Sequence, residues 1–225
     1  MLNQTYFEKA RRNMVYNQLI PNGITNKKLI DAFLKVPRHN FILSKWKNVS
    51  YTDSALPICN NMINSGRFMM PTFIMAKMYQ FSNITLSSKV LDFYCNTCYS
   101  SSIISHIAKK VVAVDTNKHL LETGVHQLSS NTKNNILFQL FQDFYNTVHD
   151  QIFDSIIVNG IMNDIPDFLK DLLVENGQIL LIQKKNYVAK IVKYIKHKDY
   201  LFQDDDYVVD VDERFIIKEI FLSKS

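Results

Sequence analysis

The spacing of apolar positions changes after residue 82 and again after residue 185, which divides the chain into three regions. In the first region, apolar residues recur at helical spacing over about 5–20 and again after Thr25, whose hydroxyl is suited to cap a helix. A third helix is predicted from Pro71 to about residue 81, because proline suits the first turn of a helix. Residues 38–70 show no sustained period and predict loops and short strands.

The middle region alternates short apolar runs with amphipathic stretches. Continuous apolar runs are typical of parallel strands that are buried on both faces. The predicted strands are 89–93, 111–115, 136–141, 153–159 and 178–183, and the predicted helices lie near 100–108, 117–130 and 165–173. This alternation predicts an α/β fold with a doubly wound, mostly parallel, Rossmann-like sheet and helices on both faces.

The last region, 186–225, is rich in β-branched and aromatic residues at alternate positions. Segments 187–196 and 206–222 are predicted to be antiparallel strands that close the sheet, although 187–198 also fits a helix. The acidic residues 204–206 between them predict a turn. Spaced acids also occur in cation sites, but no glycine or distal glutamate completes such a loop here, so no metal is predicted.

The three regions are expected to form a single domain. Residues 1–82 would be a helical extension, residues 83–185 the α/β core, and residues 186–225 the closing strands. A hydrophobic content of 47% is enough for a sizeable core, so disorder is not expected.

Charge, hydropathy and cysteine content argue against a nucleic-acid-binding, membrane-spanning or secreted protein. The net charge of +5 is spread over short lysine patches, which favours a solvated surface over a nucleic-acid interface. No apolar run approaches the roughly 20 residues that span a bilayer, and no secretory signal is visible. Three cysteines, an odd number, indicate reduced thiols in the cytoplasm.

Residues 89–115 carry the strongest chemical signal. They predict a strand, a tight turn at 94–98, a helix and a second strand that ends at Asp115. A carboxylate at that position is suited to accept the ribose hydroxyls of a nucleoside cofactor. Aspartate is equally suited to cap the following helix, so both interpretations stay open. The turn of such a site is usually rich in glycine, yet this one has none.

Two further polar residues follow predicted strands. Asp143, beside an aromatic residue, is placed to hold an adenine ring or to form an ordinary turn at the end of a strand. Asn159 ends the fourth strand of the core at the same carboxyl edge, where open α/β sheets bind their ligands.

Cys95 and Cys98 form a Cys-x-x-Cys pair within the turn. Such a pair occurs in redox dithiols and in zinc sites. A zinc site would need further paired ligands, and the sequence offers only Cys59 and scattered histidines. Two small residues in a tight turn is the preferred interpretation, with a thiol-based redox or metal protein as a separate hypothesis.

Many short matches in the correct order resemble the protein-L-isoaspartate O-methyltransferase family, a branch of the class I methyltransferases that use S-adenosylmethionine. They cover roughly residues 8–183 and fall at 12–15, 18–19, 23–24, 36–38, 41, 51–58, 71, 76–78, 90–92, 114–115, 153–154, 156–158, 165–166, 169, 172 and 177. The resemblance implies methyl transfer from S-adenosylmethionine to the carboxylate of isoaspartyl residues in damaged proteins or peptides. No oligomeric state is implied.

The resemblance also assigns the site: it implies that the extension 1–82 lies on the substrate side and that the core 83–185 binds the cofactor. It places the cofactor against Asp92, Tyr94, Asn96, Cys98, Asp115, Asp143 and Asn159. Three of these positions, 94, 96 and 98, are glycines in the family, and Met69 stands where the family has a catalytic serine. Methionine has no hydroxyl to donate to a substrate carboxylate. These departures leave an alternative, a catalytically degenerate protein of the same fold that acts as a binding module.

Overall fold

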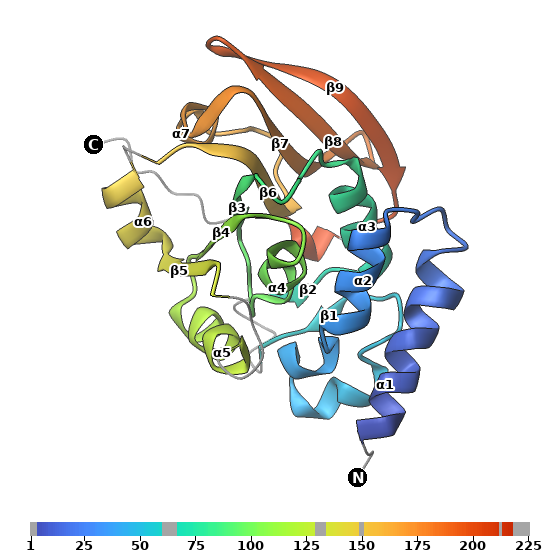
Figure 1. Cartoon of the computed structure of the whole chain (residues 1–225). Coiled ribbons are helices and arrows are strands. Elements are labelled where there is room, and N and C mark those ends of the chain that lie inside the picture. The colour runs from blue at the N-terminus through green and yellow to red at the C-terminus, as the bar shows by residue number, and fades with distance from the viewer. Residues whose placement is uncertain (1–3, 60–66, 129–133, 149–150, 212, 218–225) are drawn as a thin grey trace.

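The computed structural model describes residues 4–59, 67–128, 134–148, 151–211 and 213–217. Within these ranges the main sheet has seven strands in the order β5-β4-β3-β6-β7-β8-β9 (Figure 1). The strands are β3 (Lys89–Phe93), β4 (Lys110–Asp115), β5 (Ile136–Leu140), β6 (Phe153–Ile161), β7 (Leu173–Lys185), β8 (Val188–His197) and β9 (Tyr200–Val209). The first five are parallel, and β8 and β9 run antiparallel, which confirms the predicted fold class.

Helices cover both faces of this sheet (Figure 1). They are α1 (Gln4–Asn13), α2 (Lys27–Lys35), α3 (Thr72–Phe81), α4 (Tyr99–Ser105), α5 (Lys118–Leu128), α6 (Phe141–Thr147) and α7 (Asp167–Asp171). Shorter elements are the helical turns η1 (Met14–Leu19), η2 (Arg38–Phe41), η3 (Ser44–Val49) and η5 (Glu213–Phe215), with a small antiparallel pair, β1 (Leu56–Pro57) and β2 (Phe68–Met69). No helix in the described ranges is both long and apolar enough to cross a membrane.

The side chains of the apolar strands contribute to two separate hydrophobic cores, one on each face of the sheet. In β3, Val90 belongs to the core shared with the N-terminal helices, α3, α4 and α5, whereas its neighbour Leu91 faces the core under α6 and α7. Ile179 and Leu180 of β7 divide in the same way. Successive side chains of a strand point to opposite faces, so a strand covered on both faces is apolar at most of its positions.

The N-terminal helices follow the predicted pattern with one correction. Helix α1 continues into η1, a π-helical segment, and together they cover the predicted helix at about 5–20. The cap of α2 is Asn26 and not Thr25, because the side-chain oxygen Oδ1 of Asn26 accepts from the backbone N–H groups of Lys28 and Leu29. Thr25 instead donates its N–H to Gln80, 2.7 Å away.

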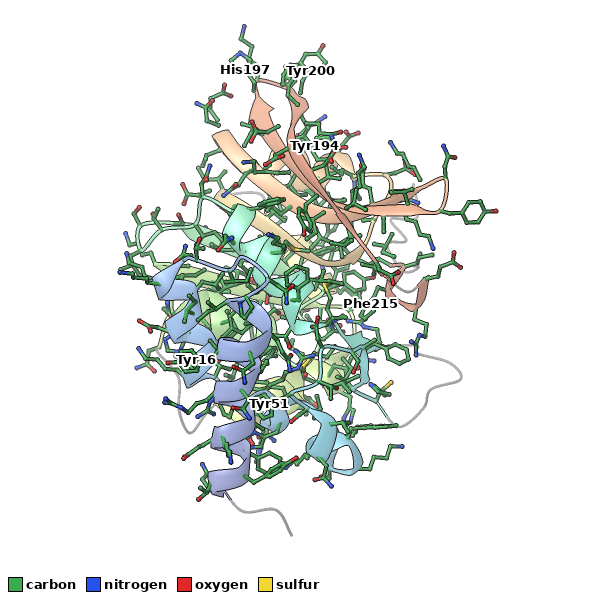
Figure 2. The ribbon with its side chains drawn as sticks, turned by 90° about the vertical axis from the view of Figure 1, so that its right-hand side faces the viewer. Tyr16, Tyr51, Tyr194, His197, Tyr200 and Phe215 are labelled. Carbon is green, nitrogen blue, oxygen red and sulfur yellow. The ribbon has the colours of Figure 1, made fainter. Side chains whose placement is uncertain are left out.

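The C-terminal strands differ from the prediction in their bounds. Segment 187–198 is a strand and not a helix, but the acidic residues 204–206 lie inside β9 and not in a turn. Their charges are balanced across the strand pair: Lys193 lies 2.6 Å from Asp204, and Lys190 lies 3.1 Å from Asp206. Figure 2 shows the reversal between the strands at His197 and Tyr200. Of the predicted strand 206–222, residues 212 and 218–222 lie outside the described residues.

Candidate cofactor site at the carboxyl edge of the sheet

The turn after β3 keeps the backbone of a glycine turn without its glycines. The φ angles are 58° at Tyr94, 56° at Asn96 and 64° at Cys98, the three positions that correspond to glycine in the resemblance. This left-handed conformation costs a non-glycine residue about 1–2 kcal/mol, and asparagine tolerates it best. Surrounding contacts must therefore hold the turn, and one of them is the bond from the Cys95 N–H to the Val114 carbonyl, at 3.1 Å.

Cys98 is accommodated by the absence of a side chain on α5. A Cβ added to Gly124 would lie 2.5 Å from the Cys98 sulfur and 2.7 Å from the carbonyl oxygen of Thr97. Both distances are too short for van der Waals contact. The helix can therefore approach the turn only because residue 124 is glycine.

Replacing Gly124 by alanine is expected to lower the free energy of unfolding by about 1–3 kcal/mol, the usual cost of overpacking. Elsewhere in a helix the same change raises the free energy of unfolding by about 1 kcal/mol. The sign of the change therefore shows whether residue 124 is tightly packed against the turn. Urea unfolding of the variant measures it. In a Cys98→Gly background the loss should be smaller, because only the Thr97 contact remains. A stabilised Gly124→Ala variant would contradict the tight approach.

Asp115 is buried, with 1% of its surface exposed, and its carboxylate is bonded within the protein. One oxygen accepts from the backbone N–H of Asn117 at 2.8 Å, and the other accepts from the N–H of Asn96 at 2.7 Å. Burial raises the pKa of the Asp115 carboxyl, while Arg67 and these N–H groups act in the opposite direction. The cap of α5 is Asn117, which accepts from Leu120, so Asp115 links the turn to the helix and is not itself the cap.

Arg67 is the side chain that completes this site. Its guanidinium forms an ion pair with the second Asp115 oxygen and donates from Nε to the Asn96 side-chain oxygen at 2.9 Å. It also lies over the Tyr94 ring, with its carbon 4.8 Å from the ring centre. Only 13% of the Arg67 side chain is exposed. The place beside Asp115 where a ribose would bind is therefore taken by an arginine of the same chain.

Asp92 forms a second, separate network below the turn. Its carboxylate accepts from the hydroxyls of Ser100 and Ser101 on α4 and from the Asn159 amide on β6, at 2.6 Å for Ser100 and Asn159. Asp92 is fully buried, and burial raises its pKa to about 6 despite these donors. Asn159 also donates to the Phe93 carbonyl at 3.2 Å. The structure thus brings two predicted site residues, Asp92 and Asn159, into direct contact.

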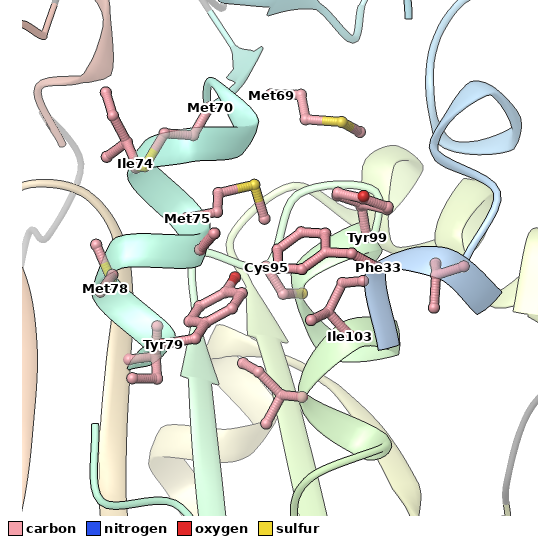
Figure 3. Packing of buried hydrophobic residues seen from close by; sticks show 14 of the residues in the cluster. Phe33, Met69, Met70, Ile74, Met75, Met78, Tyr79, Cys95, Tyr99 and Ile103 are labelled. Atoms are coloured by element: carbon pink, nitrogen blue, oxygen red, sulfur yellow. The ribbon is translucent and has the colours of Figure 1, made fainter. Parts of the chain in front are cut away.

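Met69 lies in β2 and is buried, with 4% of its surface exposed. Figure 3 shows it in the same cluster of buried residues as Met75, Cys95 and Tyr99. The space left among Met69, Met75, Cys95 and Asn159 is about 20 Å³, the room that one water molecule takes. The position of the family's serine is therefore part of an apolar core.

The buried guanidinium of Arg38 holds the backbone beside Met69. It donates to the carbonyl of Met70 at 2.8 Å and to that of Ser50 at 2.9 Å. It also stacks on Tyr99, with its carbon 5.0 Å from the ring centre. Burial removes the guanidinium from water and lowers the pKa of Arg38. Its bonds to the two loops therefore stabilise the fold only against the free energy that is lost when the charge is desolvated.

Asp143 is not part of a turn at the end of a strand, because helix α6 begins directly after β5. The side chain is exposed in the first turn of α6, where an acid suits the positive end of the helix. Its aromatic neighbour Phe141 packs against Phe93 and Phe168, with ring centres 5.7 and 5.9 Å away. A role for Asp143 in holding adenine stays a prediction.

The two cysteines of the turn are buried, and their sulfur atoms lie 3.8 Å apart without a disulfide. Burial raises the pKa of Cys95, which disfavours the thiolate that redox chemistry requires. In the described part of the chain, no three His, Cys, Asp or Glu side chains gather as metal ligands do. The geometry favours two small residues that fill a tight turn.

Sequence reasoning missed Arg67, Ser100 and Ser101. A signal for the serines was present, because Ser100, Ser101 and Ser102 follow the turn where a helix begins. Arg67 gave none: its partners Asn96 and Asp115 lie 29 and 48 residues further along the chain.

A family model of the protein-L-isoaspartate(D-aspartate) O-methyltransferases matches residues 10–211. The chain belongs to this family. A protein-L-isoaspartate O-methyltransferase of Dictyoglomus thermophilum is 30% identical over 175 residues, which are 78% of this chain and 77% of the relative. Protein-L-isoaspartate O-methyltransferase 2 of Geotalea uraniireducens is 31% identical over 172 residues, 76% of this chain and 77% of the relative.

Solved structures of the family share the fold. One protein-L-isoaspartate O-methyltransferase aligns with a TM-score of 0.73 and 18% identity over 91% of this chain and 67% of its own. A Plasmodium falciparum protein described as a member, in complex with S-adenosyl-L-homocysteine, aligns with a TM-score of 0.70 and 17% identity over 91% and 95% of the two chains. The scaffold of the family is therefore present.

Proposed function

We propose that this protein is an S-adenosylmethionine-dependent methyltransferase that acts on the carboxylates of isoaspartyl residues in damaged proteins or peptides. Family membership supports this, because the relatives named above match about three quarters of the chain. The observation that carries it is the carboxyl edge itself. Asp115 ends the second core strand beside a turn whose backbone keeps the left-handed shape at all three altered positions.

The residues of this edge do not fit the cofactor in the arrangement that the structure describes. Arg67 pairs with Asp115 where the ribose would lie, and the ring of Tyr94 lies under the guanidinium. The cavity beside Met69 and Asn159 is about 20 Å³, whereas the cavity lined by Thr97, Asn117 and His119 is about 400 Å³, within the range of about 300–1,000 Å³ that is usual for pockets of small ligands and cofactors. A ligand that binds to Asp115 therefore requires Arg67 to move, and we derive no chemical step from the present arrangement.

The substrate and the compartment are part of the same proposal. Isoaspartyl residues arise in proteins and peptides, so the partner is a polypeptide. The buried thiols of Cys95 and Cys98, 3.8 Å apart and unlinked, fit a reducing compartment such as the cytoplasm.

Calorimetric titration with S-adenosylhomocysteine tests cofactor use directly. The unchanged protein is expected to bind weakly, and a Tyr94→Gly, Cys98→Gly variant at least about tenfold tighter, which equals about 1.4 kcal/mol. The reason is that both changes remove side chains from positions that glycine occupies in the family, and that the Tyr94 ring lies against the guanidinium that covers Asp115. Transfer of a labelled methyl group to an isoaspartyl peptide then measures activity, with and without Met69→Ser.

A matched control is Cys98→Gly alone, which relieves strain but leaves the Tyr94 ring in place. Absence of binding in every variant, with the fold intact by circular dichroism, would reject the enzymatic proposal. The alternative, a degenerate family member that binds a protein partner, would then stand on Met69 and on the arginine that occupies Asp115. Binding without methyl transfer in the Met69→Ser variant would point to a different substrate.

A further inference from the structure

Arg67 and a ribose compete for the same atoms. An ionised carboxylate has about four acceptor positions, and Asp115 already gives one to the Asn96 N–H, one to the Asn117 N–H and one to Arg67. The two N–H groups belong to the turn and to the start of α5, so they stay in place when a ligand arrives. A ribose with two hydroxyl donors needs the position that Arg67 takes.

The placement of Arg67 rests on more than the ion pair. Its Nε donates to the side chain of Asn96 at 2.9 Å, and its guanidinium lies 4.8 Å from the centre of the Tyr94 ring. Asn96 and Tyr94 are two of the three positions that have lost glycine. The side chains that replaced glycine therefore help to hold the arginine that covers Asp115.

We infer that Arg67 determines the affinity of this protein for its cofactor by occupying the ribose position of Asp115. This rests on the proposed function. A nucleoside binds only when Arg67 has withdrawn, so the apparent dissociation constant is raised in inverse proportion to the fraction of molecules in the withdrawn state. Arg67 thus acts as a built-in competitor for a nucleoside that carries both ribose hydroxyls.

The test compares S-adenosylhomocysteine binding by the unchanged protein and by Arg67→Ala. The variant is expected to bind at least tenfold tighter. Arg67→Gln is expected to lie between the two, because its shorter amide keeps a donor for Asp115 but loses the charge, and it serves if Arg67→Ala folds poorly. Arg12→Ala is the matched control: Arg12 is also stacked on a tyrosine, Tyr16, but lies on the exposed surface of α1. Its affinity should equal that of the unchanged protein.

The part of the ligand that competes can be identified with nucleosides. Adenosine should gain affinity in Arg67→Ala, whereas 2′,3′-dideoxyadenosine, which lacks both hydroxyls, should gain little. An equal gain for both nucleosides would overturn the assignment of Arg67 to the ribose position.

Failure of this inference is distinguishable from failure of the proposed function. If the Tyr94→Gly, Cys98→Gly variant binds S-adenosylhomocysteine but Arg67→Ala binds no tighter than the unchanged protein, the inference is wrong and the function stands. If no variant binds, both fail. Weaker binding by Arg67→Ala would show that the arginine supports the pocket, and it would also overturn the inference.

Discussion

Replacing Asp115 by alanine is expected to lower the free energy of unfolding by about 3–5 kcal/mol, the usual cost of removing one partner of a buried ion pair. The carboxylate binds Arg67, the Asn96 N–H and the Asn117 N–H, so its loss leaves a largely buried guanidinium and two backbone donors without this acceptor. Urea unfolding at neutral pH measures the change. A residue kept only for a ligand would show little loss of stability without that ligand.

Asp154→Ala is the matched control for that experiment. Asp154 is an exposed carboxylate at the start of β6 that accepts one backbone bond, from Lys89 at 2.7 Å. Its loss should cost about 1 kcal/mol, as for a single ordinary hydrogen bond. If Asp115→Ala costs no more than this control, Asp115 does not hold the turn together, and its carboxylate is available to a ligand.

Asp92→Asn is expected to gain stability relative to the unchanged protein as the pH rises. Burial raises the pKa of Asp92 from 3.8 to about 6. Between these values the folded state keeps a proton that the unfolded state has lost, so the free energy of unfolding of the unchanged protein falls as the pH rises through this window. A shift of about two pKa units corresponds to about 3 kcal/mol. Asparagine does not titrate, so the variant escapes this loss.

Urea unfolding of both proteins between pH 4 and pH 7.5 gives the difference directly. Burial also lowers the pKa of His39 to about 4, and this group acts in the opposite direction over an overlapping window. His39 is present in both proteins, so its contribution cancels in the difference. Thr97→Val is a control that removes a buried hydrogen bond, to the Phe41 carbonyl at 2.7 Å, without removing a titrating group. A pH-independent difference for Asp92→Asn would show that Asp92 does not titrate with a raised pKa.

The strands of the core were predictable because a strand covered on both faces is apolar at most of its positions. β3 was predicted with its observed bounds, and β4 and β5 within one residue at one end. The acidic residues of β9 were not predictable by the same reasoning. Acids favour turns in isolation, whereas here lysines on the neighbouring strand balance two of them, and a cross-strand partner leaves no local signal.

The site residues that follow the core strands were predictable, because the order and direction of the strands bring them together. Parallel strands end at the same edge, so Asp115, Asn159 and the turn had to lie near one another. The arginine that reaches this edge was not predictable, since it lies directly before β2, outside the main sheet. Its side-chain direction is set by an ion pair and a ring contact, neither of which follows from spacing along the sequence.

In the glycine-free turn, the backbone shape of a nucleotide-binding loop occurs without the glycines that usually permit it. Its backbone has the left-handed angles of a nucleotide-binding loop, yet Tyr94 and Cys98 point side chains into the surroundings of that loop. Neighbouring contacts, and not the freedom of glycine, impose the shape. The main-chain shape of such a loop can thus be kept while the side chains that replace glycine decide how readily a nucleoside enters.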